Sequence, residues 1–344
     1  MLDYPLLPTS LVGSYAQPNW LIDKKRLGER LPPRVILNEL WKPDPSDLEE
    51  AQNDATLVAL NDQRRARVDI VTDGEMRRES YSNRFANALE GVDIDNPGQA
   101  MDRTGKQVPV PRVIGEIRRR ISVEAPYIEF LKQHTDKPIK ITLPGPFTMS
   151  QQAEDQYYND PSALAMDYAA AVNDEIHDLF IAGADMVQID EPWLQARPEA
   201  ARDYAIPSIN RALEGVEGAT ALHLCMGYAA MIKDRPDHYH FLEELSQCPV
   251  DQISVETAQP NLDLSALIPI ADKTIILGVI NLDDMTVESE QLVADRIERA
   301  FEFLAPENVI PAPDCGFKYL PRDIAFAKLQ VLVEGTRLVR QKLG

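Results

Sequence analysis

Short runs of β-forming residues alternate with long helical patterns along almost the whole chain, and this alternation constrains the fold more than any other feature. Such alternation is typical of a parallel sheet, because parallel neighbours need a long crossover between them, usually a helix. About eight runs of this kind are found, each followed by polar or turn residues. They are Ser10 to Val12, Val68 to Thr72, Ile139 to Leu143, Met186 to Ile189, Ala219 to Leu224, Gln252 to Val255, Thr274 to Val279 and Val309 to Ala312.

Four segments carry the clearest helical pattern, with apolar residues at three- and four-residue spacing and charges between them. They are Pro45 to Arg67, Ser162 to Ala182, Ser289 to Leu304 and Arg322 to Leu343. About eight successive βα units predict a (β/α)8 TIM barrel. A doubly wound open sheet is the alternative, but the chain has no glycine-rich first turn of the G-x-G-x-x-G kind.

Two stretches do not fit the βα pattern. The segment 92–111 is too long and too rich in turn residues for a simple βα loop, so we predict an inserted excursion that forms a hairpin over the top of the barrel. The first forty or so residues are irregular. No linker, repeat or low-complexity tract is evident, which predicts one domain over residues 1–344.

The charge balance and the cysteine count limit the classes of partner and compartment. Lys and Arg number 35, Asp and Glu number 55, and the net charge is −20. Nucleic acids and anionic membranes bind basic surfaces, so we expect neither as a main partner.

The chain also lacks an apolar run of membrane-spanning length and a signal-peptide start, which predicts a cytoplasmic protein. Three cysteines, an odd number, indicate reduced thiols rather than a disulfide framework.

Polar residues stand directly after the predicted strands or, for His223, one residue before the end of a strand, where the active sites of barrels lie. They include Ser14, Asp73 and Glu75, Asp190 and Glu191, His223 and Cys225, Glu256, Asn281 and Asp283, and Asp314 and Cys315. His223 and Cys225 are two residues apart, so one strand directs both side chains to the same side. With Glu256 and Cys315 from other strands they predict a tetrahedral zinc site, in which the carboxylate is the most easily displaced ligand.

Each of these motifs also has a purely structural explanation. An isolated H-x-C is weak evidence for a metal, because buried cysteines and hydrogen-bonded histidines are common in cores. The pair Asp190 and Glu191 is also compatible with a helix N-cap. Cys248 lies before the sixth predicted strand, away from the other ligands, and we interpret it as structural. The metal hypothesis therefore rests on the four ligand types meeting at one rim.

Six motifs follow one another in an order that resembles a known family. They are Val12-Gly13-Ser14, Asp73-Gly74-Glu75, Ile189-Asp190-Glu191-Pro192, His223-Leu224-Cys225, Val255-Glu256-Thr257 and Pro313-Asp314-Cys315-Gly316. Together they resemble the catalytic barrel of cobalamin-independent methionine synthase over nearly the whole chain. The resemblance implies a (β/α)8 barrel with a zinc ion that activates the thiol of homocysteine for methyl transfer. It implies His223, Cys225, Glu256 and Cys315 as zinc ligands, and Ser14, Glu75 and Asp190 as the residues that hold the amino-acid part of the substrate.

This role is chemically consistent with the ligand set. A free thiol is mostly protonated at neutral pH, and coordination to zinc deprotonates it. Exchange of Glu256 for the substrate sulfur would open the coordination position.

The chain departs from the family on the side of the methyl donor. The full-length family enzyme has a second, N-terminal barrel, and we expect this chain to be the catalytic barrel alone. Residues 147–152 and 193–196 replace the stretches that contact folate in the family. Asp283 stands where the family has a proton-donating histidine, and it could take that role only if it were buried. We therefore predict thiol activation, while 5-methyltetrahydropteroyltriglutamate is one of several candidate donors.

Other functions remain compatible with the sequence. One is a different thiol alkylation, similar to that of epoxyalkane:coenzyme M transferase, although two carboxylates suited to an ammonium group favour an amino-acid thiol. Another is methyl transfer from a separate corrinoid protein. From a different class, the chain could be a noncatalytic zinc-binding subunit that works with a partner, in which case the site would be closed to added thiols. The sequence also leaves open a homo-oligomer or an auxiliary protein.

Overall fold

Six parallel strands form the central sheet of the computed structural model, which describes residues 4–29, 32–227, 238–283 and 285–344. Their order in the sheet follows their order in the chain. The strands are β3 (Lys140–Pro144), β5 (Met186–Asp190), β6 (Ala219–Leu224), β7 (Gln252–Glu256), β8 (Thr274–Ile280) and β9 (Val309–Pro313). Each coincides with a predicted run to within a residue, because the runs are apolar and end at polar or turn residues.

Two short extended segments connect the two edges of this sheet. Ser10 donates its backbone N–H to the carbonyl of Pro311 at 3.1 Å and forms a parallel bridge with Ile70. Val71 in turn forms a parallel bridge with Ile139, beside β3. The first two predicted runs therefore occupy the positions expected of the first two barrel strands, although each is too short to be a full strand. The order of the eight segments is that of a (β/α)8 barrel.

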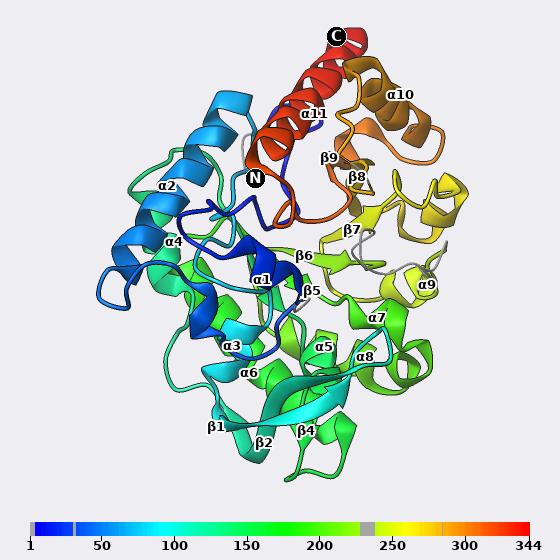
Figure 1. Ribbon diagram of the computed structural model, residues 1–344. Helices are drawn as coiled ribbons and strands as arrows, with labels where there is room; N and C mark the ends of the chain where they lie inside the picture. The colour runs from blue at the N-terminus through cyan, green and yellow to red at the C-terminus, as the bar shows by residue number, and fades with distance from the viewer. Residues whose placement is uncertain (1–3, 30–31, 228–237, 284) are drawn as a thin grey trace.

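Helices surround these strands (Figure 1). The long ones are α2 (Leu48–Ala66), α6 (Pro161–Ile181), α8 (Pro198–Ala212), α10 (Glu290–Ala300) and α11 (Arg322–Leu343). The predicted helix over Arg322 to Leu343 matches α11 residue for residue, and α2, α6 and α10 lie within their predicted segments or extend one residue beyond. The side chain of Asp160 accepts the N–H groups of Ser162 and Ala163, which explains why α6 begins at Pro161.

The remaining helices are short and belong to the connections. They are α1 (Lys24–Glu29), α3 (Asn83–Asn87), α4 (Ala125–Lys132), α5 (Pro146–Gln151), α7 (Trp193–Ala196), α9 (Leu242–Leu245) and the 3-10 turns η1 (Asn38–Leu40), η2 (Leu264–Ile270) and η3 (Pro306–Asn308). The ends of the chain are tied together, since Arg340 of α11 binds the carbonyl of Leu7 at 2.8 Å and the carboxylate of Asp69 at 2.6 Å.

The predicted excursion is an antiparallel hairpin, as expected, and it is longer than residues 92–111. It consists of β1 (Glu90–Met101) and β2 (Gln107–Arg118), with the two-residue strand β4 (Glu154–Asp155) paired to β2. The Asp102 carboxylate accepts the N–H groups of Thr104 at 2.7 Å and Lys106 at 2.9 Å. Gly105 there has φ +79°, a conformation that favours glycine. These local bonds fix the turn that the sequence Asp102 to Lys106 predicts.

The interior of the ring of strands is apolar at one level and polar above it. An apolar cluster draws residues from strand positions all around the ring: Val12, Ile70, Met186, Ala221, Ile276, Ile310 and Ala312. Lys140 pairs with Met186 in register and therefore faces the same interior. Its ammonium group donates to the carbonyl of Leu11. Burial lowers the pKa of Lys140 to about 7, against the opposing charge of Asp190.

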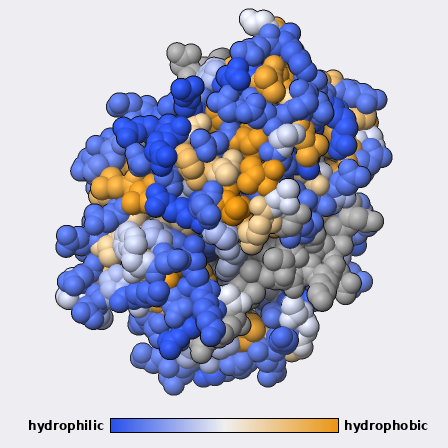
Figure 2. All heavy atoms as spheres, turned by 45° about the horizontal axis from the view of Figure 1, so that its top comes forward, coloured by the Kyte–Doolittle hydropathy of each residue, from blue (hydrophilic) through white to orange (hydrophobic). Residues whose placement is uncertain are grey.

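The outer surface is mainly hydrophilic on the face shown in Figure 2, with hydrophobic side chains gathered in a few patches. Scattered apolar side chains are normal on folded proteins, while the excess of acidic groups keeps the surface charged. Within the described part of the chain, no helix combines the length and the apolar character needed to cross a membrane.

Lys140 makes the stability of the barrel depend on pH. Its pKa is lower in the folded chain than in the unfolded chain, so the unfolded chain binds more protons between pH 7 and 10 and stability rises with pH. The free energy of unfolding of the wild type should therefore increase by roughly 1 to 2 kcal/mol between pH 7 and 9 through Lys140, and we expect Lys140→Met to lack this increase. Urea unfolding at several pH values measures it. The exposed Lys137→Met is the control, and equal pH slopes in wild type and Lys140→Met would contradict the assignment.

Candidate metal centre

A pocket of about 580 Å³, its open mouth included, lies at the carboxyl ends of the strands. Six of the residues predicted for the site line it: Ser14, Glu75, Asp190, His223, Cys225 and Cys315. The strand register explains their meeting, because Pro144, Asp190, His223 and Ser254 are successive partners across β3, β5, β6 and β7. Inward-facing residues at the same level of a barrel point into the same space.

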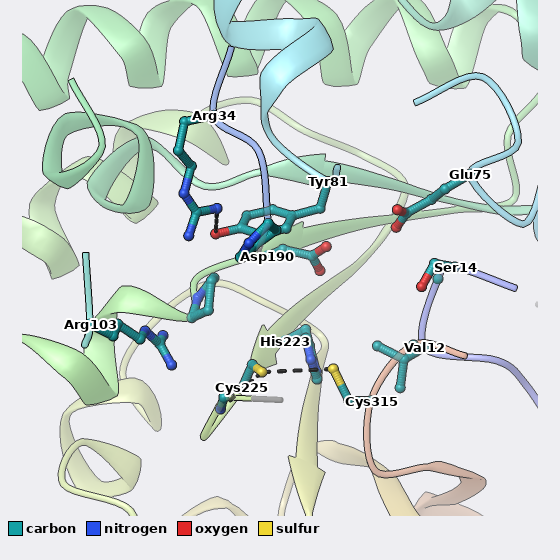
Figure 3. A pocket seen from close by; sticks show the side chains of 15 residues that line it. Val12, Ser14, Arg34, Glu75, Tyr81, Arg103, Asp190, His223, Cys225 and Cys315 are labelled. Atoms are coloured by element: carbon teal, nitrogen blue, oxygen red, sulfur yellow. Dashed lines mark hydrogen bonds between the residues drawn. The ribbon is translucent and has the colours of Figure 1, made fainter. Parts of the chain in front are cut away.

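His223, Cys225 and Cys315 form a compact buried group (Figure 3). One potential ligand atom from each lies within 4.8 Å of the others, and no other group of three or more such residues is found in the described ranges. The two sulfur atoms are 3.7 Å apart. His223 is on β6, Cys225 follows that strand directly, and Cys315 follows the end of β9. One nitrogen and two sulfurs at this spacing are typical of zinc ligand sets.

His223 carries the observation that most directly indicates a ligand. Its Nδ1 forms a hydrogen bond of 2.9 Å with the Ser254 hydroxyl, on the neighbouring strand β7. Its Nε2 is buried and has no hydrogen-bond partner among the residues that the structure describes. A buried nitrogen without a partner is costly, whereas metal-binding histidines use one nitrogen for the ion and anchor the other. The tautomer with the proton on Nδ1 leaves the Nε2 lone pair for a cation.

The two thiols differ in their readiness to ionise. The pKa of Cys225 is lowered well below its usual range, first by the hydrogen bond with the Cys315 thiol and then by His223 and the Arg103 guanidinium, which together outweigh burial. The backbone N–H of Gly227 also donates to the Cys225 sulfur at 3.2 Å. The same thiol pair and burial raise the pKa of Cys315. Cys225 is thus the sulfur that this environment favours as a thiolate, the form that binds metals.

Glu256, the fourth predicted ligand, lies beside this group but outside the set that meets within 4.8 Å. Its carboxylate is fully buried and accepts the backbone N–H of Met226 and the side-chain amide of Gln259, both at 2.8 Å. Burial raises its pKa, and the neighbouring Cys225 raises it further. Glu256 is the last residue of β7 and is not among the described residues that line the pocket. No short motif indicates its two hydrogen-bond partners.

Two carboxylates and a hydroxyl line another part of the pocket. The Glu75 carboxylate accepts the Thr142 hydroxyl at 3.3 Å and lies 3.8 Å from the Lys318 ammonium. Asp190 accepts the Gln188 amide at 2.8 Å, and burial raises the pKa of Asp190 to about 6. Ser14 lies near them (Figure 3). This acidic end of the pocket suits a small cationic group such as an ammonium.

Glu191, next to Asp190, has a structural role instead. Its carboxylate accepts the N–H groups of Phe147 at 3.0 Å and Thr148 at 2.8 Å, and the Thr148 hydroxyl at 2.6 Å. It thereby satisfies N–H groups in the first turn of α5 from a distant segment, whereas the N-cap of α7, the helix that follows the Asp-Glu pair, is Pro192.

Two other residues of the sequence analysis lie apart from the pocket. Asp283 is exposed, donates its backbone N–H to Asn281 at 2.7 Å, and is not among the described residues that line the pocket. The burial that its predicted proton-donor role requires is therefore not seen. Cys248 is a buried member of the main hydrophobic core, as the structural interpretation predicts.

Sequence reasoning missed the cationic wall of the pocket, formed by Arg34, Tyr81 and Arg103. The Arg34 guanidinium donates to the Tyr81 hydroxyl at 2.9 Å. Arg103 belongs to the turn of the β1–β2 hairpin and packs at 5.7 Å over the Trp193 ring. Its Nη2 is buried and has no hydrogen-bond partner within the described ranges. The hairpin therefore covers the site, as predicted. The sequence could predict the hairpin, but it could not show which turn residue enters the pocket.

Comparisons with known proteins point to one family. The sequence model described as "Cobalamin-independent synthase, Catalytic domain" matches residues 7–337. The methionine synthase of Saccharolobus solfataricus is 34% identical over 351 residues, which cover 100% of this chain and 98% of that protein. The solved B12-independent methionine synthase from Shewanella sp. W3-18-1, in complex with selenomethionine, is 30% identical with a TM-score of 0.89 and covers 98% of this chain and 99% of its own. A putative vitamin-B12 independent methionine synthase from Listeria monocytogenes, at 19% identity and a TM-score of 0.73 over 100% of both chains, shares the fold.

The Ser254 hydroxyl fixes the ring of His223, so its loss should weaken metal binding. We expect Ser254→Ala to bind a divalent transition metal about tenfold more weakly than the wild-type chain. Competition with a chelating dye measures this affinity. Ser208→Ala is the matched control, because Ser208 is also buried and donates to Ala205 at 2.8 Å within α8. Unchanged affinity in Ser254→Ala, or equal weakening in Ser208→Ala, would contradict the role of Ser254.

Proposed function

The chain belongs to the family of cobalamin-independent synthase catalytic domains, methyltransferases that convert homocysteine to methionine, and we propose that it carries out this methyl transfer at a zinc ion. The ion would be held by His223, Cys225 and Cys315, with Glu256 as the exchangeable fourth ligand. The observation that carries this proposal is the buried Nε2 of His223, which has no hydrogen-bond partner in the described part of the chain and belongs to a group with two sulfur atoms. Soft sulfur donors with an imidazole favour zinc over magnesium or calcium.

The bound ion would supply a Lewis acid that deprotonates the substrate thiol at neutral pH. The chain's own residues set the conditions for this chemistry. The ligand atoms are buried, so water is largely kept from the sulfur. Two cysteine thiolates already offset the charge of a divalent cation, so a substrate thiolate that replaced the carboxylate would be poorly neutralised and would stay nucleophilic.

Glu75, Asp190 and Ser14 would hold the amino-acid end of homocysteine. Although burial raises the pKa of Asp190 to about 6, its carboxyl is mostly ionised at neutral pH and can pair with an ammonium group. Two carboxylates at this end favour an amino-acid thiol over a sulfonate thiol. The Shewanella relative, solved in complex with selenomethionine, gives independent support for an amino-acid substrate.

The methyl donor would approach from the opposite wall. Arg34, Tyr81 and Arg103 lie across the pocket from Ser14 and Glu75, with Cys225 and His223 between the two sides (Figure 3). A substrate anchored at Glu75 with its sulfur at the ligand group leaves this cationic wall facing the nucleophile. A donor with anionic or hydrogen-bond-accepting groups fits such a wall, whether it is a methylfolate or is carried by a corrinoid protein.

The zinc proposal predicts both a ligand set and its change on substrate binding. X-ray absorption at the zinc edge should count two sulfur ligands in the purified protein and three after homocysteine is added. Cys315→Ala should hold well below one zinc per chain, because the site loses one of its ligands. Cys248→Ala is the matched control, since Cys248 is also buried but lies outside the group. Full zinc content in Cys315→Ala, or no third sulfur with homocysteine, would contradict the proposal.

The amino-acid subsite predicts a change in substrate binding at constant metal content. Asp190→Asn keeps the shape of the side chain but removes its charge, so we expect the KM for homocysteine to rise by about tenfold or more, as for a lost charged hydrogen bond. Zinc content should stay at one per chain. The control substrate is 4-mercaptobutyrate, which lacks the amino group. If the KM of the variant for 4-mercaptobutyrate rises by the same factor as its KM for homocysteine, Asp190 does not bind the ammonium group.

A further inference from the structure

The carboxylate of Glu256 is held by two hydrogen bonds beside the His/Cys/Cys group, outside the set of ligand atoms that meet within 4.8 Å. One oxygen accepts the backbone N–H of Met226 and the other accepts the amide of Gln259, each at 2.8 Å. The side chain is fully buried. A buried carboxylate that left a cation without finding new donors would carry a large desolvation cost, and these two bonds offset it.

The amide of Gln259 is held with its NH2 group toward Glu256. Its carbonyl oxygen accepts the backbone N–H of Leu282 at 3.3 Å, which leaves the amide nitrogen for the carboxylate. The backbone N–H of Gln259 donates to the Asp314 carboxylate at 2.5 Å. Asp314 directly precedes Cys315, so Gln259 is fixed to the segment that supplies a ligand. Such support on both sides is what a precisely positioned donor requires.

The backbone of Glu256 is fixed as well. Its N–H donates to the Tyr239 hydroxyl at 2.7 Å, and that hydroxyl reaches the carbonyl of Leu224 at 3.3 Å, directly before Cys225. The phenol thus joins the ends of β6 and β7. With the main chain held, rotation about the side-chain torsions is the available motion of the carboxylate. Cys225 and Glu256 directly follow Leu224 and Val255, the last register pair of β6 and β7, so the carboxylate stands beside the end of the strand that supplies two of the ligand residues.

We propose that Met226 and Gln259 receive the Glu256 carboxylate when the substrate thiol takes its place in the ligand set, which makes Gln259 a positioning residue for ligand exchange. This inference rests on the proposed function. One thiolate enters as one carboxylate leaves, so the charge of the ligand set is unchanged, and the thiol proton passes to solvent. The structure places the carboxylate on these two donors. Without the Gln259 donor, the carboxylate competes more strongly with the thiol.

The test follows the exchange itself rather than turnover. Cobalt(II) replaces zinc in the wild-type chain and in Gln259→Met, and homocysteine is added while the sulfur-to-cobalt absorption is recorded. We expect half-saturation at about tenfold higher homocysteine in Gln259→Met, with one metal per chain in both. Gln156→Met is the matched control, because the Gln156 amide also donates to a glutamate, Glu154, at 2.6 Å on the hairpin sheet. Gln259→Lys, which restores a donor, should recover most of the loss.

The outcomes separate this inference from the function on which it rests. If the wild-type protein gains no sulfur absorption with homocysteine, the proposed function itself is wrong. If the wild-type protein responds and Gln259→Met responds at the same concentration, only the docking role is overturned. A shift of equal size in Gln156→Met, or a loss of bound metal in both Gln259 variants, also overturns it.

Discussion

The register of the parallel strands is the constraint on which the site depends. Backbone pairing across β3, β5, β6 and β7 brings Pro144, Asp190, His223 and Ser254 to one level. A shift by one residue along any strand would turn its inward side chains outward, because side chains alternate between the two faces. The contact between His223 and Ser254, which aims the free imidazole nitrogen, exists only in this register. The chemistry at the rim is therefore a consequence of backbone hydrogen bonds deep in the sheet.

A site of this kind places charged groups inside the barrel, where burial destabilises them unless they find hydrogen-bond partners. The structure provides dedicated partners, such as the three donors to Glu191 and the three backbone N–H groups of residues 257–259 that Asp314 accepts. These partners come from neighbouring strand ends, so they also connect the loops that carry the ligands. Among the buried polar atoms that lack a hydrogen-bond partner in the described part of the chain, His223 Nε2 and Arg103 Nη2 belong to residues that line the pocket. Polar atoms left unsatisfied there are the ones available to a ligand.

Local sequence patterns predicted the elements closely, and long-range contacts were predicted less well. The helix over Arg322 to Leu343 and the strand ends before Cys225 and Cys315 were predictable, because apolar periodicity and turn residues act over a few positions. The hairpin was predictable as an insertion, but its extent, 90–118, depends on pairing that one short segment does not encode. Arg34 lies in the irregular first forty residues, and no pattern there indicates that its side chain enters the pocket.

The sequence by itself determined which ligand types stand at the end of each strand, and with that the chemistry open to the site. An imidazole, two thiols and a carboxylate in this order indicate a zinc site, because strand direction alone carries them to one rim. The tertiary structure decided which atoms meet. It joined His223, Cys225 and Cys315, turned Glu256 toward Gln259, and brought Arg103 in from the hairpin. These choices depend on side-chain torsions and on contacts between distant segments, and neither is fixed by the residues nearby in the chain.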